Sequence, residues 1–393
     1  SIFNFKEMRI FLYKSFIFVI PVFVLLGIPT SILVYSGESF SKIEEVVEKG
    51  DEYLIGFAYQ EVNYEFLKWK ELYNKPKQEV IALGSSRVLP FRDKMFITSF
   101  YNCGYTITSI ADFLPFLKAI PTEKKPKYLI LGLDQWMFNA NWDELNTEGS
   151  KNRYSPATLD WKGLYTANFS PAIIKDVWKD LFRRKYGINI FAKENNIKKV
   201  GLNAILNNKG FLKDGSFYYG NHINFILEDS PLANDYHFQD TYSRIEEGNR
   251  RFEYASIVNP KAINKIKELL SYLKEENIKA VAFLPPFADA VNTKMEETKK
   301  YAYMEQIYPL LKPIFETYDF ELWDMSHFST YSADDKEAID GFHGGEVAYL
   351  RMMIYMIENN SILKDVTDIF QLKKDLDNRI NTLLVYPPYK LYK

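Results

Sequence analysis

The stretch Ile81-Ala82-Leu83-Gly84-Ser85-Ser86-Arg87 is an apolar run that stops abruptly at a glycine and two serines. Such a run is typical of a buried β-strand, which would deliver a serine hydroxyl to the carboxyl edge of a sheet. Open α/β sheets bind their ligands at that edge. Because a serine is a weak nucleophile until a base takes its proton, the hypothesis requires a histidine, and an acid to orient it, elsewhere in the chain.

A segment near the C-terminus, 338–346, supplies such a pair. Asp340 and His343 stand three residues apart in it. This spacing can place the carboxylate against one ring nitrogen of the histidine while the other nitrogen faces the serine. Two glycines follow His343 and are predicted to give the backbone the freedom to present it. The alternative base is His327, which follows Asp324 at the same spacing.

The two stretches together resemble a known family. A Gly-x-Ser block after the first core strand and a C-terminal Asp-x-x-His block are similar to those of the SGNH (GDSL-like) esterase and acyltransferase superfamily. In the family's Gly-Asp-Ser block the nucleophile is the third residue, which matches Ser86, with Ser85 as the alternative. The variant Gly-Ser-Ser is closer to the membrane-anchored cell-envelope branches, which D-alanylate teichoic acids or O-acetylate alginate and cellulose beside a membrane-bound O-acyltransferase (MBOAT).

The resemblance also implies where an oxyanion would bind. Backbone N–H groups of Ser86 and Gly104 would donate to it, since Gly104 matches the glycine of the family's second block. The third block of the family is Gly-x-Asn-Asp, and here Asp134 replaces the donor asparagine. A carboxylate would repel an oxyanion. Either Gln135 therefore supplies the amide, or Asp134 has another task, such as orienting an acceptor hydroxyl.

The segment 87–100 is predicted to begin a helix whose positive N-terminal end points at Ser86 and favours a developing oxyanion. Arg87 at its start would either attract an anionic polymer or form a structural salt bridge. The sequence does not separate these two roles.

Alternating strand-like and helix-like segments predict an α/β fold. The resemblance implies a three-layer, SGNH-like parallel sheet flanked by helices. We expect strands at 79–83, 100–105, 127–136, 280–284 and 321–324, and further helices at 109–120, 260–276, 293–318 and 346–358. The boundaries that we predict are a cytoplasmic stub and membrane helix (1–36), a stalk and lead-in helix (37–78), the SGNH-like domain (79–360) and a helical tail (361–393). Within the domain, 139–251 interrupts the rhythm and is interpreted as an insertion or cap.

The N-terminal region predicts a single membrane-spanning helix. Residues 16–35 carry no charge over about 20 residues, enough to cross a bilayer. Three basic residues precede this run and three glutamates follow it, which predicts a cytoplasmic N-terminus and an extracytoplasmic domain. A cleaved signal peptide is the alternative. Pro21 and Pro29 would leave backbone groups unpaired in lipid, a hint that the helix packs against a membrane protein.

Composition narrows the function further. The net charge of −2 gives no electrostatic footprint for nucleic acid. Cys103 is the only cysteine, so no disulfide can form within the chain. The four histidines lack metal-ligand spacing, and His222 and His237 are interpreted as structural or surface residues.

We therefore expect an extracytoplasmic serine acyltransferase, bound to the cell membrane and its lipid, that needs no cofactor. It would move an acetyl or D-alanyl group onto hydroxyls of a cell-envelope polysaccharide or teichoic acid. Because the domain would lie outside, the resemblance implies an MBOAT partner that passes the acyl group across the membrane. A carbohydrate or lipid esterase would use the same triad. A non-catalytic polymer-binding subunit is the third interpretation, motivated by Asp134.

Overall fold

The computed structural model describes residues 5–39, 46–47, 52–59, 64–145, 171–185 and 197–388. The chain divides into two compact units, which we call unit 1 (1–63 and 160–210) and unit 2 (64–159 and 211–393). The predicted insertion 139–251 contributes to both units. Its residues 146–170 and 186–196 lie outside the described residues, as do 389–393 at the end of the predicted tail.

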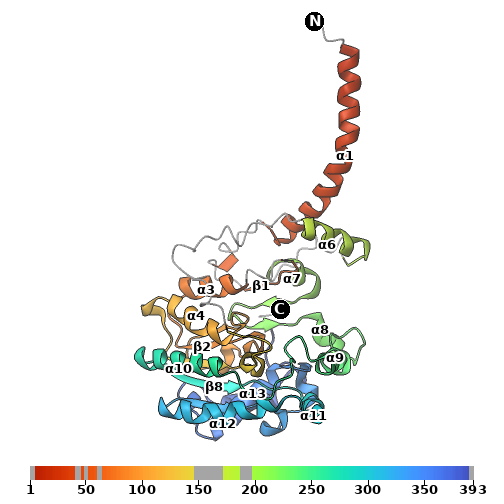
Figure 1. Cartoon of the computed structure of the whole chain (residues 1–393). Coiled ribbons are helices and arrows are strands. Elements are labelled where there is room, and N and C mark those ends of the chain that lie inside the picture. Colours follow the sequence, from red (N-terminus) through yellow and green to blue (C-terminus); the bar gives the residue numbers. More distant parts are fainter. Residues whose placement is uncertain are drawn as a thin grey trace. The chain divides into compact units, whose positions relative to one another are not determined.

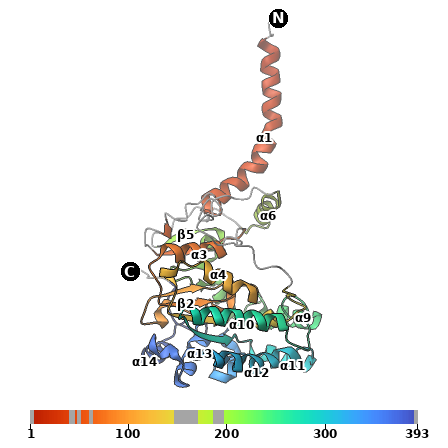
Figure 2. The same ribbon diagram turned by 60° about the vertical axis from the view of Figure 1, so that its left-hand side comes forward.

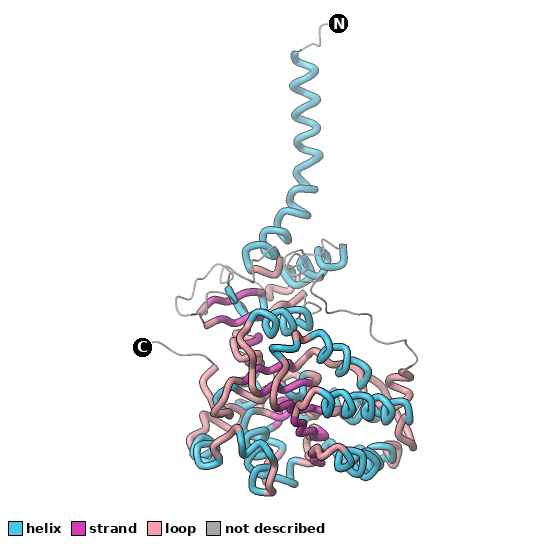
Figure 3. Tube along the Cα trace, turned by 90° about the vertical axis from the view of Figure 1, so that its left-hand side faces the viewer, coloured by secondary structure: helices cyan, strands magenta, loops and turns pink. Residues whose placement is uncertain are grey.

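Unit 2 is built on a five-stranded parallel sheet with helices on both sides of its strands (Figure 3). Its strands are β2 (Val80–Leu83), β3 (Phe100–Cys103), β4 (Tyr128–Gly132), β8 (Lys279–Leu284) and β9 (Glu321–Asp324), in the order β3-β2-β4-β8-β9. The three central strands are almost wholly buried and correspondingly apolar, as expected for strands covered on both faces. The predicted α/β fold with a parallel sheet is confirmed.

The strand order places a topological switch point at the carboxyl ends of β2 and β4. From β2 the chain moves outward to β3 and then crosses back to β4 on the other side of β2. Open sheets of this kind bind ligands in the crevice where the direction of winding reverses. Ser85 and Ser86 follow the end of β2 by two and three residues, and Asp134 follows the end of β4 by two. The topology therefore brings these polar residues to one place.

Several predicted helices are present. They are α4 (Phe113–Ala119, preceded by a 3-10 turn at Ile110–Asp112), α10 (Pro260–Glu275) and α13 (Glu346–Glu358). The start of α10 follows from its sequence, because the Asn259 side chain accepts from the N–H of Lys261 and Pro260 occupies the first helical position. Further elements of unit 2 include α3 (Tyr64–Asn74), β7 (Phe217–Tyr218), α8 (Asn221–Leu227), α9 (Gln239–Glu247), β10 (Ala338–Asp340), β11 (His343–Gly344) and α14 (Ile369–Asp377).

The prediction of a helix at 87–100 is wrong. This segment contains only 3-10 turns, at Ser86–Val88 and Asp93–Met95. Pro90 has no N–H to continue a helix. The carbonyl groups of Val88 and Phe91 instead accept from the side-chain amide of Asn102, at 2.8 and 2.9 Å. No helix dipole of the predicted kind therefore points at Ser86.

The predicted helix 293–318 is two helices, α11 (Asp289–Thr298) and α12 (Ala302–Thr317), seen separately in Figure 2. The break falls at Lys299, whose φ of 56° is left-handed and ends α11. Because this residue is a lysine and neither glycine nor proline, the local sequence does not predict the break between the two helices.

Unit 1 contains the long helix α1 (Phe5–Ser36). It is long and apolar enough to cross a membrane, as predicted. The other elements of this unit are β1 (Tyr53–Ile55), which pairs in parallel with β5 (Lys198–Val200), then α6 (Pro171–Phe182) and α7 (Leu202–Asn207), with β6 (Gly210–Phe211) at its boundary. A small core joins Ile32 and Leu33 of α1 to Val177 of α6 and Leu202 of α7.

Candidate active site

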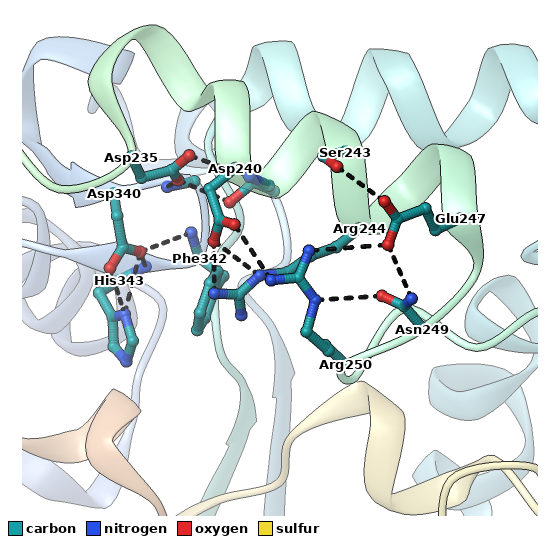
Figure 4. Close-up of polar contacts among 12 residues, drawn as sticks. Asp235, Asp240, Ser243, Arg244, Glu247, Asn249, Arg250, Asp340, Phe342 and His343 are labelled. Carbon is teal, nitrogen blue, oxygen red and sulfur yellow. Dashed lines mark hydrogen bonds and ion pairs between the residues drawn. The ribbon is translucent and has the colours of Figure 1, made fainter.

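Ser86, His343 and Asp340 come together at the carboxyl end of β2. The Ser86 Oγ lies 2.7 Å from the His343 Nε2, although 257 residues separate the two in sequence. The Nδ1 of His343 lies 2.8 Å and 2.9 Å from the two carboxylate oxygens of Asp340. Figure 4 shows Asp340 directly beside the imidazole. This is the order of contacts in a Ser-His-Asp triad.

The Asp-x-x-His spacing builds this geometry locally. Asp340 ends β10, His343 begins β11, and the two short strands pair antiparallel. Between them the Asp340 Oδ1 accepts from the N–H groups of Phe342 and His343, at 3.0 and 2.9 Å. The side chain thus closes a turn of its own backbone, as aspartates commonly do. The same turn presents the carboxylate to the imidazole.

The ionisation of Asp340 suits its place in the triad. Burial alone would raise the pKa of this carboxyl. The adjacent His343, together with hydrogen bonds from its ring and from the two backbone N–H groups, outweighs that effect and holds the pKa of Asp340 below its ordinary value. Asp340 is therefore an anion at neutral pH and can stabilise an imidazolium.

The glycines around the histidine are required by space, not by backbone freedom. Gly345 has φ of −81°, which any residue can adopt. A Cβ there would lie 2.9 Å from the carbonyl oxygens of both Glu337 and Leu383. Gly341 is similarly closed in, because a Cβ would lie 2.6 Å from the Thr241 Oγ1. Side chains at these positions would displace the turn that carries the triad.

Asp235 holds this turn from outside. Its Oδ2 accepts from the N–H of Gly341 at 2.9 Å and from the Thr241 hydroxyl at 2.6 Å, and its Oδ1 accepts from the N–H of Thr241 at 2.9 Å. Figure 4 shows Asp235 next to the segment of Asp340 and Phe342. Asp235 could not be predicted as part of the site, because a single aspartate in a polar stretch belongs to no recognisable motif.

The two serines have different surroundings. Ser85 is buried, and its Oγ accepts from the N–H of Arg87 at 3.1 Å, which caps the 3-10 turn. Ser86 is half-buried and contacts His343. Among the described residues, the N–H of Ser86 meets no acceptor. The geometry thus offers Ser86 as the nucleophile and its own N–H as a donor to an oxyanion.

Gly104, the expected second donor, is engaged elsewhere. Its N–H donates to the Asn102 Oδ1 at 2.8 Å. The position is also tightly packed, since a Cβ on Gly104 would lie 2.7 Å from the Leu89 side chain. To serve an oxyanion, the N–H of Gly104 would have to leave Asn102.

Arg87 is buried, and both of its terminal nitrogens donate hydrogen bonds within the protein, which corresponds to the structural one of its two predicted roles. Its guanidinium donates to the Pro285 and Pro286 carbonyls, at 2.7 and 2.6 Å, and to the Gln135 Oε1 at 2.8 Å. It lies between the rings of Trp136 and Phe287, 4.9 and 4.4 Å from their centroids. Arg87 follows β2 and donates to residues that follow β4 and β8, so it connects the ends of these three strands. Its side chain is not exposed to a polymer.

Gln135 does not supply the missing amide in this arrangement. Its Nε2 donates to the Pro285 carbonyl at 2.8 Å and to the Ser326 Oγ at 3.1 Å. Asp134 is buried and lies 3.4 Å from Arg87. Burial raises the pKa of Asp134, against the opposing effects of the Arg87 charge and the Ser85 hydroxyl. Asp134 is thus held beside the serines by an ion pair.

His327 and His237 have other partners than the residues of this arrangement. His327 lines a 440 Å³ cavity with Gln135 and Asp324, and Ser86 is not among its lining residues. Its acidic neighbour is Asp289 at 3.9 Å, whereas the Asp324 carboxylate accepts from Ser326. His237 is exposed and pairs with Asp229. No group of three or more potential metal ligands occurs in the described part of the chain.

Comparisons with known proteins give no relative for this chain. No protein-family model matches it, and neither a curated protein nor a solved structure does. The site is therefore interpreted from its own geometry.

Proposed function

We propose that this chain is a membrane-anchored serine O-acyltransferase whose acyl group is carried on Ser86. The observation that carries the proposal is the 2.7 Å contact between the Ser86 Oγ and the His343 Nε2, with Asp340 on the far side of the ring. Its SGNH-like assignment rests on the motifs at Ser86 and His343. The switch-point position of Ser86 supports it.

The reaction has two halves. In the first, His343 takes the hydroxyl proton as the Ser86 Oγ attacks the carbonyl carbon of the acyl donor. The resulting imidazolium, stabilised by Asp340, then protonates the leaving group, and the acyl group remains as an ester on Ser86. In the second half, an acceptor hydroxyl loses its proton to His343 and attacks this ester. His343 returns the proton to Ser86 as the acyl group leaves.

Each tetrahedral intermediate places a negative charge on the former carbonyl oxygen. The N–H of Ser86 has no other acceptor within the described residues and is the first donor to this charge. The second donor that the motif implies is the N–H of Gly104, once it exchanges Asn102 for the oxyanion.

The substrates follow from the resemblance and from α1. The acyl group is acetyl or D-alanyl, and the acceptor is a hydroxyl of a cell-envelope polysaccharide or teichoic acid. The bias of basic residues before the apolar run of α1 favours a cytoplasmic N-terminus. An extracytoplasmic triad would then need a membrane partner, of the MBOAT class, to deliver the acyl group. An esterase is the second candidate, because water would complete the same second half-reaction.

Active-site labelling tests the triad. A fluorophosphonate should label the full chain, and Ser86→Ala should abolish the labelling. Ser85→Ala is the matched control, because Ser85 contacts the backbone of Arg87 and should leave labelling in place. Equal labelling of wild type and Ser86→Ala would exclude Ser86 as the nucleophile.

Mass analysis of the envelope polymer tests the transfer. Cells carrying Ser86→Ala should lose polymer acyl groups that cells with Ser85→Ala retain. Unchanged acylation in the Ser86→Ala cells would exclude the transferase. More acyl groups in those cells than in wild type would identify an esterase.

A further inference from the structure

Helix α6 of unit 1 has three distinct faces. Ile174 and Val177 are buried, and Val177 packs in the small core with α1 and α7. Trp178 and Phe182 follow one another at a spacing of four, and their rings stack with centroids 5.5 Å apart. Phe182 nevertheless leaves 78% of its surface exposed. The third face is polar and mixes lysines with aspartates, among them Lys179 and Asp176.

The Trp178 ring donates a hydrogen bond to α1 at a carbonyl group that has no partner within the helix. The Trp178 Nε1 donates to the carbonyl of Leu25 at 2.8 Å. In an α-helix that carbonyl would accept from the N–H four residues on, but that residue is Pro29, which has none. Inside a bilayer an unpaired carbonyl would be costly. Trp178 thus pairs the Leu25 carbonyl, a backbone group for which the sequence had suggested a partner in another membrane protein.

The burial along α1 shows which part of it is free to meet lipid. All the large apolar side chains from Phe5 to Ile28 are exposed, whereas Pro29, Ile32 and Leu33 are buried in unit 1. The part of α1 in which every large apolar side chain is exposed therefore ends near Ile28. Beyond it one side of the helix packs in unit 1, while Val34 and Tyr35 stay about half exposed. About 20 residues counted back from Ile28 begin at Arg9 and include Lys14, whose amine can extend to the N-terminal boundary of the bilayer. This places Leu25, and with it Trp178, at the membrane boundary.

Between α1 and α6 lies an open groove of about 1140 Å³. Its walls are apolar except at its rim and include Val24 and Leu25 of α1 and Trp178 and Phe182 of α6, with Lys175 beside them. Figure 1 shows α6 next to the C-terminal end of α1. The groove is thus open at the depth where a bilayer passes from acyl chains to headgroups.

We propose that α6 is an interfacial membrane helix and that a lipid acyl chain occupies the groove. Trp178 and Phe182 then lie among the acyl chains, as aromatic residues of interfacial helices do. Lys175 extends its amine toward the phosphate groups. Helix α6 lies within 139–251, the region predicted as a cap over the active site. In this proposal it is a second membrane contact of unit 1, in addition to α1.

Site-directed spin labelling of the full chain tests this. Cys103 is buried, and Cys103→Ala leaves no other cysteine to label. Phe182→Cys in that background places a nitroxide at the groove. Asp176→Cys is the matched control, because residue 176 is exposed on the same helix and lies about 120° around the axis from residue 182. Both variants are reconstituted in vesicles of phosphatidylcholine and phosphatidylglycerol.

The label at 182 should collide with oxygen several-fold more, and with a water-soluble nickel chelate several-fold less, than the label at 176. Equal access of the nickel chelate to both labels would overturn the proposal. Protection of 182 from both reagents, with dipolar broadening that vanishes on dilution by unlabelled protein, would mean that a second copy fills the groove, and this also overturns it. Ser86→Ala should leave these accessibilities unchanged, so their failure and that of the acyltransferase proposal are separate results.

A second measurement uses Trp178 itself. Brominated lipids should quench part of the protein's tryptophan emission, and Trp178→Phe should lose that quenched part. The same fractional quenching in wild type and in Trp178→Phe would place Trp178 outside the acyl region and contradict the proposal.

Discussion

The Arg92 Nη1 lies 2.5 Å from the Glu346 Oε1, although 254 residues separate the two in sequence. Both residues are buried. Arg92 follows the turn that carries Ser86, and Glu346 is the first residue of α13, three after His343. The other Glu346 oxygen accepts from the N–H groups of Val385 and Tyr386, at 2.9 and 3.1 Å. This ion pair therefore connects the segment of Ser86 to the segment of His343.

Replacing Arg92 by methionine should destabilise unit 2 by about 3–5 kcal/mol, because it leaves the charges of Glu346 and Asp214 buried without their shared partner. Urea unfolding of the full chain in detergent, followed by circular dichroism, measures the change. Lys274→Met is the control, since its ion pair with Asp319 is exposed and should contribute less than about 1 kcal/mol. Equal destabilisation by the two variants would show that the buried pair does not connect the segments.

Lys68 should give the protein a distinctive rise in stability with pH. Burial lowers the pKa of Lys68 to about 7, from 10.5. Its amine donates to the Asn102 carbonyl at 2.9 Å and also to that of Gly215. Between pH 7 and 9 the unfolded chain binds a proton at this amine that the folded chain has largely released, so stability rises with pH by up to about 1 kcal/mol per unit.

Lys68→Met should remove this rise. The measurement is the free energy of unfolding of wild type and variant at pH 7, 8 and 9, with the exposed Lys94→Met as a control that keeps the wild-type slope. A constant difference between wild type and Lys68→Met across this range would contradict the shifted pKa.

Under the proposed acyl-transfer mechanism, Asp340→Asn should slow turnover of an ester substrate by a factor on the order of 10³ or more, because an amide no longer holds the imidazole as a carboxylate does. The variant should also lose part of the acid sensitivity of folding. The pKa of Asp340 is lowered in the fold, so its stabilising effect is present above its ordinary pKa near 4 and is lost as the pH falls through the lowered value. Turnover and acid unfolding together check this, and a variant with wild-type turnover would remove Asp340 from the triad.

The parts of this fold that could be predicted are those in which neighbouring residues share one environment. Strands such as Val80–Leu83 and Tyr128–Gly132 are buried on both faces and appear as apolar runs. The Asp340–His343 pair could be predicted for a related reason. One short turn contains both the backbone hydrogen bonds and the contact between the side chains.

What could not be predicted depends on contacts between distant segments. Asn102 replaces helical hydrogen bonds at Val88 and Phe91, which is why the predicted helix 87–100 is absent. Gly104 was expected to serve the oxyanion, and the same Asn102 engages its N–H. Arg92 and Glu346 are single charged residues, and only the folded chain shows that they form a pair.

Asp235 supplies a last prediction, since it contacts the triad turn without belonging to the triad. Asp235→Ala removes the acceptor for Gly341 N–H and for both donors of Thr241. The turn of Asp340 and His343 then loses its outer support. A displacement of about 1 Å can cost up to about 10²-fold in rate, so kcat should fall by about 10- to 10²-fold, whereas KM should change little.

Two control variants separate positioning from general damage. Thr241→Val keeps the Asp235 bond to Gly341 and should lower kcat much less than Asp235→Ala. Asp229→Ala disrupts only an exposed pair with His237 and should leave kcat unchanged. If Asp235→Ala retains wild-type kcat while its fluorophosphonate labelling is also as fast as in wild type, the turn of Asp340 and His343 holds its geometry without Asp235, and the triad is organised by its local hydrogen bonds alone.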